Sequence, residues 1–279
     1  MNLYPALALI RHRLNSRGTA GHGVHSPFIY DFLTTVIRNK TPEHIVKHVE
    51  GLRREMKADN RIISVIDMGA GSLKRSGEKR RVRDIAGVAS LPPKQAEVIA
   101  RIAQSIIQPV WSRETGDTAS GDSEKEGIVL ELGTSLGIST LAIARAVPLR
   151  RVVTVEGCPS LAVIARENLL RHGAKNAEVM NLEFSKALGK LQEGGEKIMF
   201  AYIDGNHRGE ALIDYVTTIS GMGEKMIIIA DDIHLNSDMY HAWKEIVRGG
   251  LGGASLETAR FGILFRKSGM TPGRYRIWC

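Results

Sequence analysis

The stretch that most constrains the fold of this 279-residue chain runs from Ile128 to Val147. It opens on a short apolar run, residues 128–130, which predicts a buried strand. Glu131 and Gly133 end that strand, and a helical pattern follows a glycine turn. A strand, a glycine turn and a helix in this order predict the first half of a nucleotide-binding βαβ unit.

The turn after this strand is suited to a bound ligand. Gly133 and Gly137 have no Cβ, so the backbone can take a positive φ and a ligand can approach it closely. Ser139 or Thr140 is expected to cap the following helix. The spacing differs from Gly-x-Gly-x-x-Gly, and no Gly-Lys-Ser/Thr follows to hold a triphosphate. An acid at the strand end, Glu131, favours a ligand that carries positive charge.

A second acidic strand end follows at the expected distance. Residues 151–156 predict a strand that ends in Glu156, 23 residues beyond Gly133. A carboxylate at this position can accept hydrogen bonds from both ribose hydroxyls of a bound nucleoside. The alternative is an acid that caps the next helix, predicted over residues 161–172.

Two further strands also end in acids. The continuously apolar runs 198–203 and 226–230 predict buried strands, which lead to Asp204 and to Asp231-Asp232. Ligands of open parallel sheets bind at the carboxyl ends of the strands, so we expect these acids beside the same ligand. Three carboxylates are a donor set that suits Mg²⁺, with Asp204, Asp231 and Asp232 as its ligands.

The segment from Glu131 to Thr140 resembles motif I of class I S-adenosylmethionine-dependent methyltransferases, in the branch of catechol and caffeoyl-CoA O-methyltransferases. The resemblance covers about residues 91–279. It implies an α/β Rossmann-like, doubly wound, seven-stranded and mostly parallel sheet with an antiparallel last strand. Residues 259–266 and 274–278 are the expected closing pair of strands.

The resemblance also implies which residues hold the cofactor. Glu156 is the expected ribose ligand, and Phe184 and Ser185 are candidates for contact with the adenine ring. The full set of expected cofactor-binding residues is Glu131, Gly133, Thr134, Ser135, Gly137, Ser139, Glu156, Gly157, Phe184, Ser185 and Asp204.

The expected catalytic residues depart from the family pattern at two positions. The family's Asp-x-x-Lys becomes Asp204-x-x-His207, so the resemblance makes His207 the candidate base, with Asp204 beside it. Asp232 stands where the metal-dependent relatives have Asn. As alternatives, one Asp contacts the methionine amino group, and His207 or His234 caps a helix. His234 is also a candidate second base or substrate contact.

The first 90 residues predict a largely helical, basic N-terminal extension. His22, His25 and Tyr30 are candidates for a substrate-pocket lid. The structural alternative is that Ser26 caps a helix with Pro27 in its first turn, and a two-histidine metal site is a third interpretation.

Three segments lie between this extension and motif I. Residues 62–72 imitate a cofactor motif, but Leu73 to Arg83 is expected to be a basic loop and not a helix, so we interpret 62–72 as a decoy. Residues 91–108 predict an amphipathic helix. A polar stretch near residues 113–127 predicts a flexible insertion in the methyltransferase domain of residues 91–279.

Charge and composition limit the function. The net charge of +8 arises entirely before residue 121, with 19 Lys/Arg against 11 Asp/Glu there and 19 of each afterwards. One cluster of basic residues is either a solvated loop or a binding site for a phosphate-bearing partner, such as RNA or an anionic small substrate. It consists of Lys74, Arg75, Lys79, Arg80, Arg81 and Arg83.

Two cysteines give no disulfide framework, and we expect no signal peptide, no membrane segment and a cytoplasmic protein. The leading hypothesis is O-methylation of a small-molecule hydroxyl with S-adenosylmethionine, with Mg²⁺ as a candidate cofactor and a homodimer as a candidate assembly. The alternatives are an RNA methyltransferase and a non-catalytic nucleotide-binding protein on the same scaffold.

Overall fold

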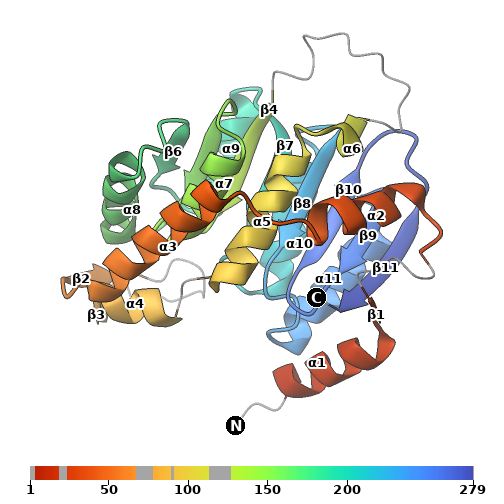
Figure 1. Cartoon of the computed structure of the whole chain (residues 1–279), viewed down its shortest axis with the longest axis horizontal. Helices are drawn as coiled ribbons and strands as arrows, with labels where there is room; N and C mark the ends of the chain where they lie inside the picture. Colours follow the sequence, from red (N-terminus) through yellow and green to blue (C-terminus); the bar gives the residue numbers. More distant parts are fainter. Residues whose placement is uncertain (1–3, 19–23, 67–77, 89–90, 113–126, 279) are drawn as a thin grey trace. The chain divides into compact units, whose positions relative to one another are not determined.

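The computed structural model describes residues 4–18, 24–66, 78–88, 91–112 and 127–278 (Figure 1). The chain divides into two compact units made of interleaved segments. The first unit contains Met1–Asn39, Ser105–Gly127 and Gly195–Cys279, and the second contains Lys40–Gln104 and Ile128–Gly194. The first 90 residues therefore contribute to both units.

The second unit carries three parallel strands, in the order β4, β5, β6. These are β4 (Gly127–Leu132), β5 (Val152–Val155) and β6 (Ala177–Met180). All four residues of β5 are buried, as its β-branched run predicts for a strand covered on both faces. The helices α7 (Ile138–Ala146) and α8 (Pro159–Arg171) make the two crossovers between these strands.

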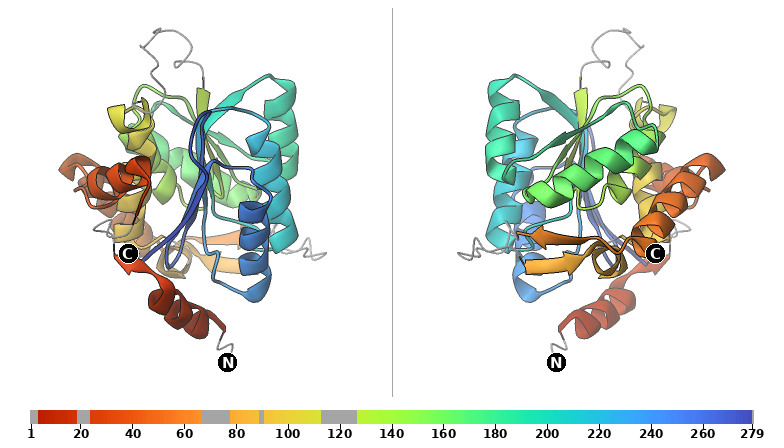
Figure 2. Two further views of the ribbon diagram at one scale, coloured as in Figure 1. Left: turned by 90° about the vertical axis from the view of Figure 1, so that its right-hand side faces the viewer. Right: turned by 90° about the vertical axis from the view of Figure 1, so that its left-hand side faces the viewer.

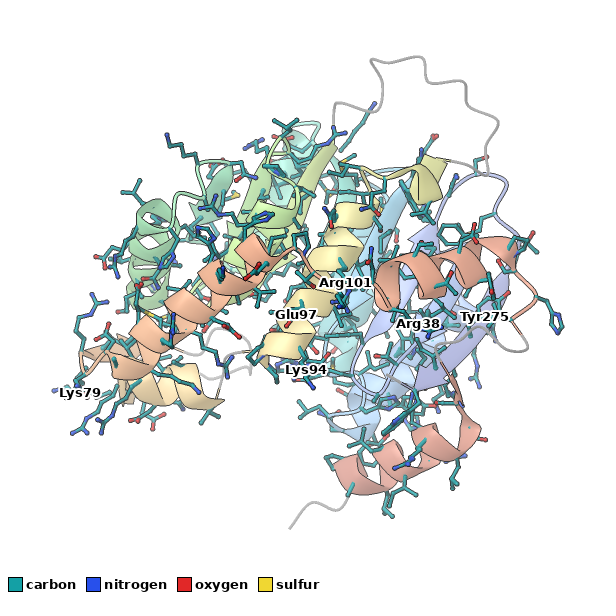
Figure 3. All side chains as sticks on the ribbon, viewed as in Figure 1. Arg38, Lys79, Lys94, Glu97, Arg101 and Tyr275 are labelled. Carbon is teal, nitrogen blue, oxygen red and sulfur yellow. The ribbon has the colours of Figure 1, made fainter. Side chains whose placement is uncertain are left out.

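The remaining helices of the second unit precede β4 or follow β6. They are α3 (Glu43–Ala58), α4 (Val82–Val88), α5 (Pro93–Ser105) and α9 (Phe184–Glu193). The amphipathic helix predicted over 91–108 is confirmed as α5, and α3 packs against α4 and α7. Figure 3 shows Lys94, Glu97 and Arg101 along one side of α5. Nη1 of Arg101 donates to Oγ1 of Thr41, 2.7 Å away.

A separate antiparallel hairpin pairs β2 (Ile62–Val65) with β3 (Glu78–Arg81). Every residue of β3 is exposed, and β2 packs against α8 (Figure 2, right). The prediction of a loop without a helix over 73–83 is therefore wrong for residues 78–83: residues 78–81 form a strand with Lys79 on it (Figure 3), and Val82 and Arg83 begin α4. Nη2 of Arg80 lies 2.7 Å from Oε2 of Glu78. The Asp67 and glycine positions of the decoy motif, with Lys74 and Arg75, lie outside the described residues.

The first unit carries strands in the order β1-β11-β9-β10-β8-β7. They are β7 (Lys197–Ile203), β8 (Met226–Ala230), β9 (Ala254–Glu257), β10 (Gly262–Arg266), β11 (Gly273–Trp278) and the two-residue β1 (Arg17–Gly18). β7 and β8 are parallel, whereas β10 runs antiparallel to both β8 and β9.

The expected closing pair of strands differs from the structure. β11 does not pair with β10; it runs parallel to β9, which lies between them, and β1 adds to its other edge. The short run Ala-Ser-Leu-Glu of β9 is half polar, which is why its pattern did not predict a strand. The expected last strand, 274–278, is β11, which runs parallel to β9, whereas β10 is the strand that runs antiparallel to its neighbours β8 and β9.

The helices of the first unit cover its strands from two sides (Figure 2). α10 (Gly209–Ser220) and α11 (Ser237–Arg248) pack side by side on one side. On the other, α2 (Pro27–Phe32) continues into η1 (Leu33–Ile37), and the Phe28 and Phe32 rings lie 5.2 and 4.8 Å from the Phe265 ring. α6 (Pro109–Ser112) packs on α2, and α1 (Tyr4–Asn15) packs on β11.

The fold is α/β and Rossmann-like, with mostly parallel strands flanked by helices and a helical N-terminal region, as the sequence predicts. Among the described residues, no helix has the length and apolar character needed to cross a membrane.

Candidate active site

The turn between β4 and α7 is built from backbone conformations that side chains rarely adopt. Gly133, Ser135 and Gly137 have φ values of 110°, 48° and 81°. Gly137 is the N-cap of α7, and no side chain caps this helix. The expectation that Ser139 or Thr140 caps it is therefore wrong: both lie inside the first turn. The backbone N–H groups of that turn are left for another acceptor, as in helix N-termini that bind ligands.

Glu131 is fully buried at the end of β4. Its Oε2 accepts hydrogen bonds from Oγ1 of Thr140 and from Oγ1 of Thr154, the latter at 2.6 Å. Oγ1 of Thr154 also lies 2.6 Å from Oγ1 of Thr134. Oε1 of Glu131 has no hydrogen-bond partner among the described residues. A buried carboxylate oxygen without a partner is costly, so this oxygen is a candidate acceptor for a polar ligand group.

Burial raises the pKa of Glu131 from 4.5 to about 7, against the lowering effect of its hydroxyl partners. The folded state binds the proton of the Glu131 carboxyl more tightly than the unfolded state does. This proton therefore stabilises the folded state fully below pH 4.5, and the stabilisation is lost as the pH rises to about 7. We expect the wild-type free energy of unfolding to fall over this range by up to about 3 kcal/mol more than that of Glu131→Gln, measured by urea denaturation. The exposed Glu193→Gln is the control, and a parallel pH profile for Glu131→Gln would contradict the prediction.

Glu156 follows β5 and faces the same turn. Its Oε2 accepts from the backbone N–H of Ser135 at 2.8 Å, and its Oε1 accepts from the backbone N–H of Cys158 at 2.9 Å. Burial raises the pKa of this carboxyl, and these N–H groups oppose the rise. A carboxylate has about four acceptor positions, so each oxygen keeps a further lone pair. Glu156 is thus a pre-oriented acceptor and not a helix cap, since the N-cap of α8 is Cys158.

The loop after β6 is joined to Glu156 by a residue that the sequence did not single out. Nδ2 of Asn181 donates to the carbonyl oxygens of Glu156 and Gly157, at 2.6 and 3.1 Å. Phe184 is half-buried and Ser185 exposed, and both lie in the first turn of α9. Asn181 therefore holds the ribose and adenine candidate positions together.

In the first unit, a buried phenol joins two of the predicted acids. The hydroxyl of Tyr202 lies 2.6 Å from Oδ2 of Asp231 and 3.0 Å from Oδ2 of Asp204. Burial, with the charges of Asp231 and Asp232, raises the pKa of Asp204 well above its usual range. A phenol has one hydrogen, so the Tyr202 hydroxyl can donate to only one of these two carboxyl groups at a time, and its shorter contact is with Asp231.

Asp231 is held by an arginine that the sequence did not reveal. Nε and Nη2 of Arg260 lie 2.5 and 2.9 Å from Oδ1 and Oδ2 of Asp231. The antiparallel register of β10 on β8, with Gly262 opposite Ala230, brings Arg260 to the residues that follow β8. Buried carboxylates need a positive charge nearby, so the sequence signal for this contact is an arginine directly before the strand that follows the acids.

The carboxylate of Asp231 is therefore fully engaged. It accepts from Tyr202, twice from Arg260, and at 2.6 Å from the backbone N–H of Asp232, whose φ is 51°. These contacts use all of its acceptor positions. The acids that remain open to a ligand differ from the predicted triad: ligand atoms of Asp204, His207 and Asp232 lie within 4.8 Å of one another.

Among the candidate residues near the N-terminus, the predicted helix cap is confirmed and the predicted lid stays a prediction. Ser26 caps α2, with its Oγ accepting from the backbone N–H of Ile29 at 3.3 Å, so the cap with Pro27 in the first turn is confirmed. His25 and Tyr30 are exposed, and His22 lies outside the described residues. Neither metal-type cluster found among the described residues contains His25.

Comparison with known proteins found a match to one family model. A family model described as a methyltransferase domain matches residues 130–233, from β4 to the residues after β8. Comparison with curated proteins found no match.

Two solved structures share the fold. The O-methyltransferase TomG from Streptomyces achromogenes, involved in tomaymycin synthesis and solved with SAM, aligns with a TM-score of 0.52 and 16% identity. The alignment covers 85% of this chain and 96% of that one. SAH-bound methyltransferase PaMTH1 from Podospora anserina aligns with a TM-score of 0.52 and 15% identity, over 82% and 90% of the two chains. Residues 130–233 thus match a methyltransferase domain model, and the chain shares the fold of these two methyltransferases.

Proposed function

We propose that this methyltransferase transfers the methyl group of S-adenosylmethionine to a hydroxyl oxygen of a small molecule. The observation that carries the proposal is Glu156, a carboxylate held by the backbone N–H groups of Ser135 and Cys158 beside the β4–α7 turn. This is the acceptor that a ribose diol needs. The relatives solved with SAM or SAH include an O-methyltransferase, which supports hydroxyl oxygen as the acceptor.

Residues of the second unit would bind the cofactor. Glu156 would accept hydrogen bonds from the ribose, and Oε1 of Glu131, which has no partner among the described residues, would accept from the methionine ammonium. Gly133 and Gly137 would let the cofactor approach the backbone of the turn. The remaining contacts in this unit are the predicted ones at Thr134, Ser135, Ser139, Gly157, Phe184 and Ser185, and a cofactor contact of Asp204 stays a prediction.

The bound cofactor supplies a methyl group already activated by its sulfonium. The acceptor oxygen forms the new C–O bond as the S–C bond breaks, so the protein has to orient the hydroxyl and accept its proton. His207 is the proposed base, because an imidazole nitrogen can accept a proton and its ring lies in the cluster with Asp204 and Asp232. Asp204 would orient the acceptor, because its carboxyl group lies with His207 and Asp232 in one cluster.

The predicted Mg²⁺ triad does not fit the described contacts. Asp231 has no acceptor position left, and Arg260 already supplies the charge that a metal would bring. Asp232 lies 3.5 Å from Nη2 of Arg260 and shares that charge. We therefore propose a metal-independent reaction, in which Arg260 supplies the positive charge beside Asp231 and Asp232.

Calorimetric titration with S-adenosylmethionine tests the cofactor, and turnover on a panel of phenols and alcohols tests the acceptor. We expect saturable binding in the presence of EDTA, and S-adenosylhomocysteine and methyl ether products detected by mass spectrometry. Added Mg²⁺ should leave the rate within about twofold, because an ion without a binding site adds no transition-state stabilisation. A tenfold increase in rate would require about 1.4 kcal/mol of it. A rate that depends on Mg²⁺ would overturn metal independence, and no heat of binding would overturn the enzyme function.

RNA is a second candidate substrate, favoured by one observation. The residues of β3, Glu78–Arg81, are all exposed and three of them are basic. If RNA were the substrate, binding would weaken steeply with salt, and Lys79→Ala would reduce that salt slope. A role in acceptor binding for residues 1–90 stays a prediction.

A further inference from the structure

A second cluster of metal-type ligands lies in the first unit, and the proposed reaction does not use it. It consists of His12 on α1, His234 in the segment after β8, and Glu257 at the end of β9. All three residues are buried, and their ligand atoms lie within 4.8 Å of one another. Buried histidine and glutamate side chains are usually paired or coordinate a metal.

The hydrogen bonds of His12 leave one ring nitrogen directed at this cluster. Nε2 of His12 lies 2.8 Å from the carbonyl oxygen of Ile277, so it carries a hydrogen and donates. Nδ1 lies 3.2 Å from Oε1 of Glu257. In neutral His12 this nitrogen is an acceptor that faces another acceptor, unless a cation lies between them. A histidine that donates its other N–H to a backbone carbonyl is the usual arrangement of a metal ligand.

His234 is the second independent observation. It is 6% exposed, and neither of its ring nitrogens has a hydrogen-bond partner among the described residues. Its Nε2 lies 3.6 Å from the same oxygen, Oε1 of Glu257. Its ring lies 5.2 Å from that of His12 and 5.0 Å from that of Tyr240, so the imidazole is enclosed by other rings. An enclosed imidazole without partners indicates that a ligand belongs beside it.

The donor set selects the ion. Two imidazole nitrogens and one carboxylate oxygen suit Zn²⁺, whereas Mg²⁺ prefers oxygen donors alone. In a tetrahedral site with metal–ligand distances of about 2.0–2.2 Å, the donor atoms lie about 3.3–3.5 Å apart. The contacts to Oε1 of Glu257, at 3.2 and 3.6 Å, bracket this spacing.

An outer partner of the carboxylate is also present. Nε of Arg276 donates to Oε1 of Glu257 at 2.8 Å, and its Nη2 lies 3.3 Å from Oε2. Nη2 also lies 3.3 Å from the hydroxyl of Tyr240. Oε1 of Glu257 thus faces Nε of Arg276 as well as the two histidines, and Oε2 faces Nη2 of Arg276. Outer partners of this kind orient metal-binding carboxylates.

We propose that His12, His234 and Glu257 bind one Zn²⁺ ion, with a water in the fourth position. The ion links α1 to β9 and to the segment after β8. That segment begins at Asp231 and Asp232, so zinc stabilises the acids of the candidate active site without contacting them. The proposal does not depend on S-adenosylmethionine binding.

The test uses the full chain, freed of metal by a chelator and titrated calorimetrically with ZnCl₂. We expect one Zn²⁺ per chain, a higher Tm with zinc, and visible absorption typical of tetrahedral coordination when Co²⁺ replaces it. His234→Asn and Glu257→Gln should each raise the Kd by more than the roughly 10- to 100-fold that loss of an outer partner costs. Circular dichroism checks that each variant is folded.

Two controls locate the ion. His241 is exposed on α11, so His241→Asn should bind zinc like the wild type. His207→Asn reports on the other cluster, with Asp204 and Asp232. Zinc binding that is lost in His207→Asn and retained in His234→Asn would overturn the proposal. The absence of zinc uptake by the wild type would also overturn the proposal.

Discussion

Replacing Arg260 with methionine is expected to lower the free energy of unfolding by about 3–5 kcal/mol, measured by urea denaturation at neutral pH. The side chain of Asp231 is 0% exposed and depends on the bidentate contact with Arg260. Without that contact a buried carboxylate loses its counter-charge, and the remaining donors, Tyr202 and a backbone N–H, are neutral. Leaving such a charge unpaired costs far more than losing an ion pair on the surface.

A double variant separates charge from shape in this prediction. Asp231→Asn combined with Arg260→Met removes both charges, so it should recover much of the loss. The exposed Arg208→Met, which removes only a contact with Asn206, should change stability by less than about 0.5 kcal/mol. If Arg260→Met stayed within about 1 kcal/mol of the wild type, Arg260 would not be the counter-charge of this cluster.

Replacing Glu156 with alanine is expected to raise the Kd for S-adenosylmethionine by about 100-fold or more, measured by calorimetry. A hydrogen bond to a charged group contributes about 1.5–3 kcal/mol, and a ribose diol can make two of them to this carboxylate. The carboxylate also fixes the N–H groups of Ser135 and Cys158, so the variant loses orientation of the turn as well.

Two comparisons make this prediction specific to the proposed ribose contact. Glu178→Ala removes an exposed acid on the neighbouring strand β6, and its Kd should match that of the wild type. Glu156→Gln keeps an acceptor oxygen but no charge, so its Kd should fall between those of the wild type and Glu156→Ala. Equal affinity in all four proteins would show that Glu156 does not contact the cofactor.

Patterns that depend on local burial could be predicted from the sequence. The apolar run of β8 matches the predicted strand 226–230, because a strand that is buried on both faces is a continuous apolar run in the sequence. The acids that end β4, β5, β7 and β8 were found for the same reason, since each directly follows such a run. β6 matches the predicted strand 177–180, although Glu178 on it is exposed. The proline-opened helix α5 was also identified.

Features that depend on tertiary contacts could not be predicted. Arg260 holds Asp231 through the register of β10 on β8, and no spacing in the sequence encodes that contact. The hydroxyl of Thr140 donates a hydrogen bond to Glu131 and does not cap α7. The helix begins instead at Gly137, whose positive φ needs no side-chain cap. Similarly, the hydrogen bonds from Asn181 to the loop after β5 join residues far apart in the chain.

The pairing of Arg17 with Ile277 has a consequence for biosynthesis. As the ribosome makes the chain from its N-terminus, all segments of the second unit emerge before β7, whereas α1 and α2 belong to a unit completed only by β11. Phe28 and Phe32 therefore lack their packing partner Phe265 while most of the chain is translated. Contacts between residues this far apart in the sequence slow folding, and apolar side chains that stay exposed in the meantime promote aggregation. The nascent N-terminal helices are therefore the segment that a chaperone would have to shield the longest.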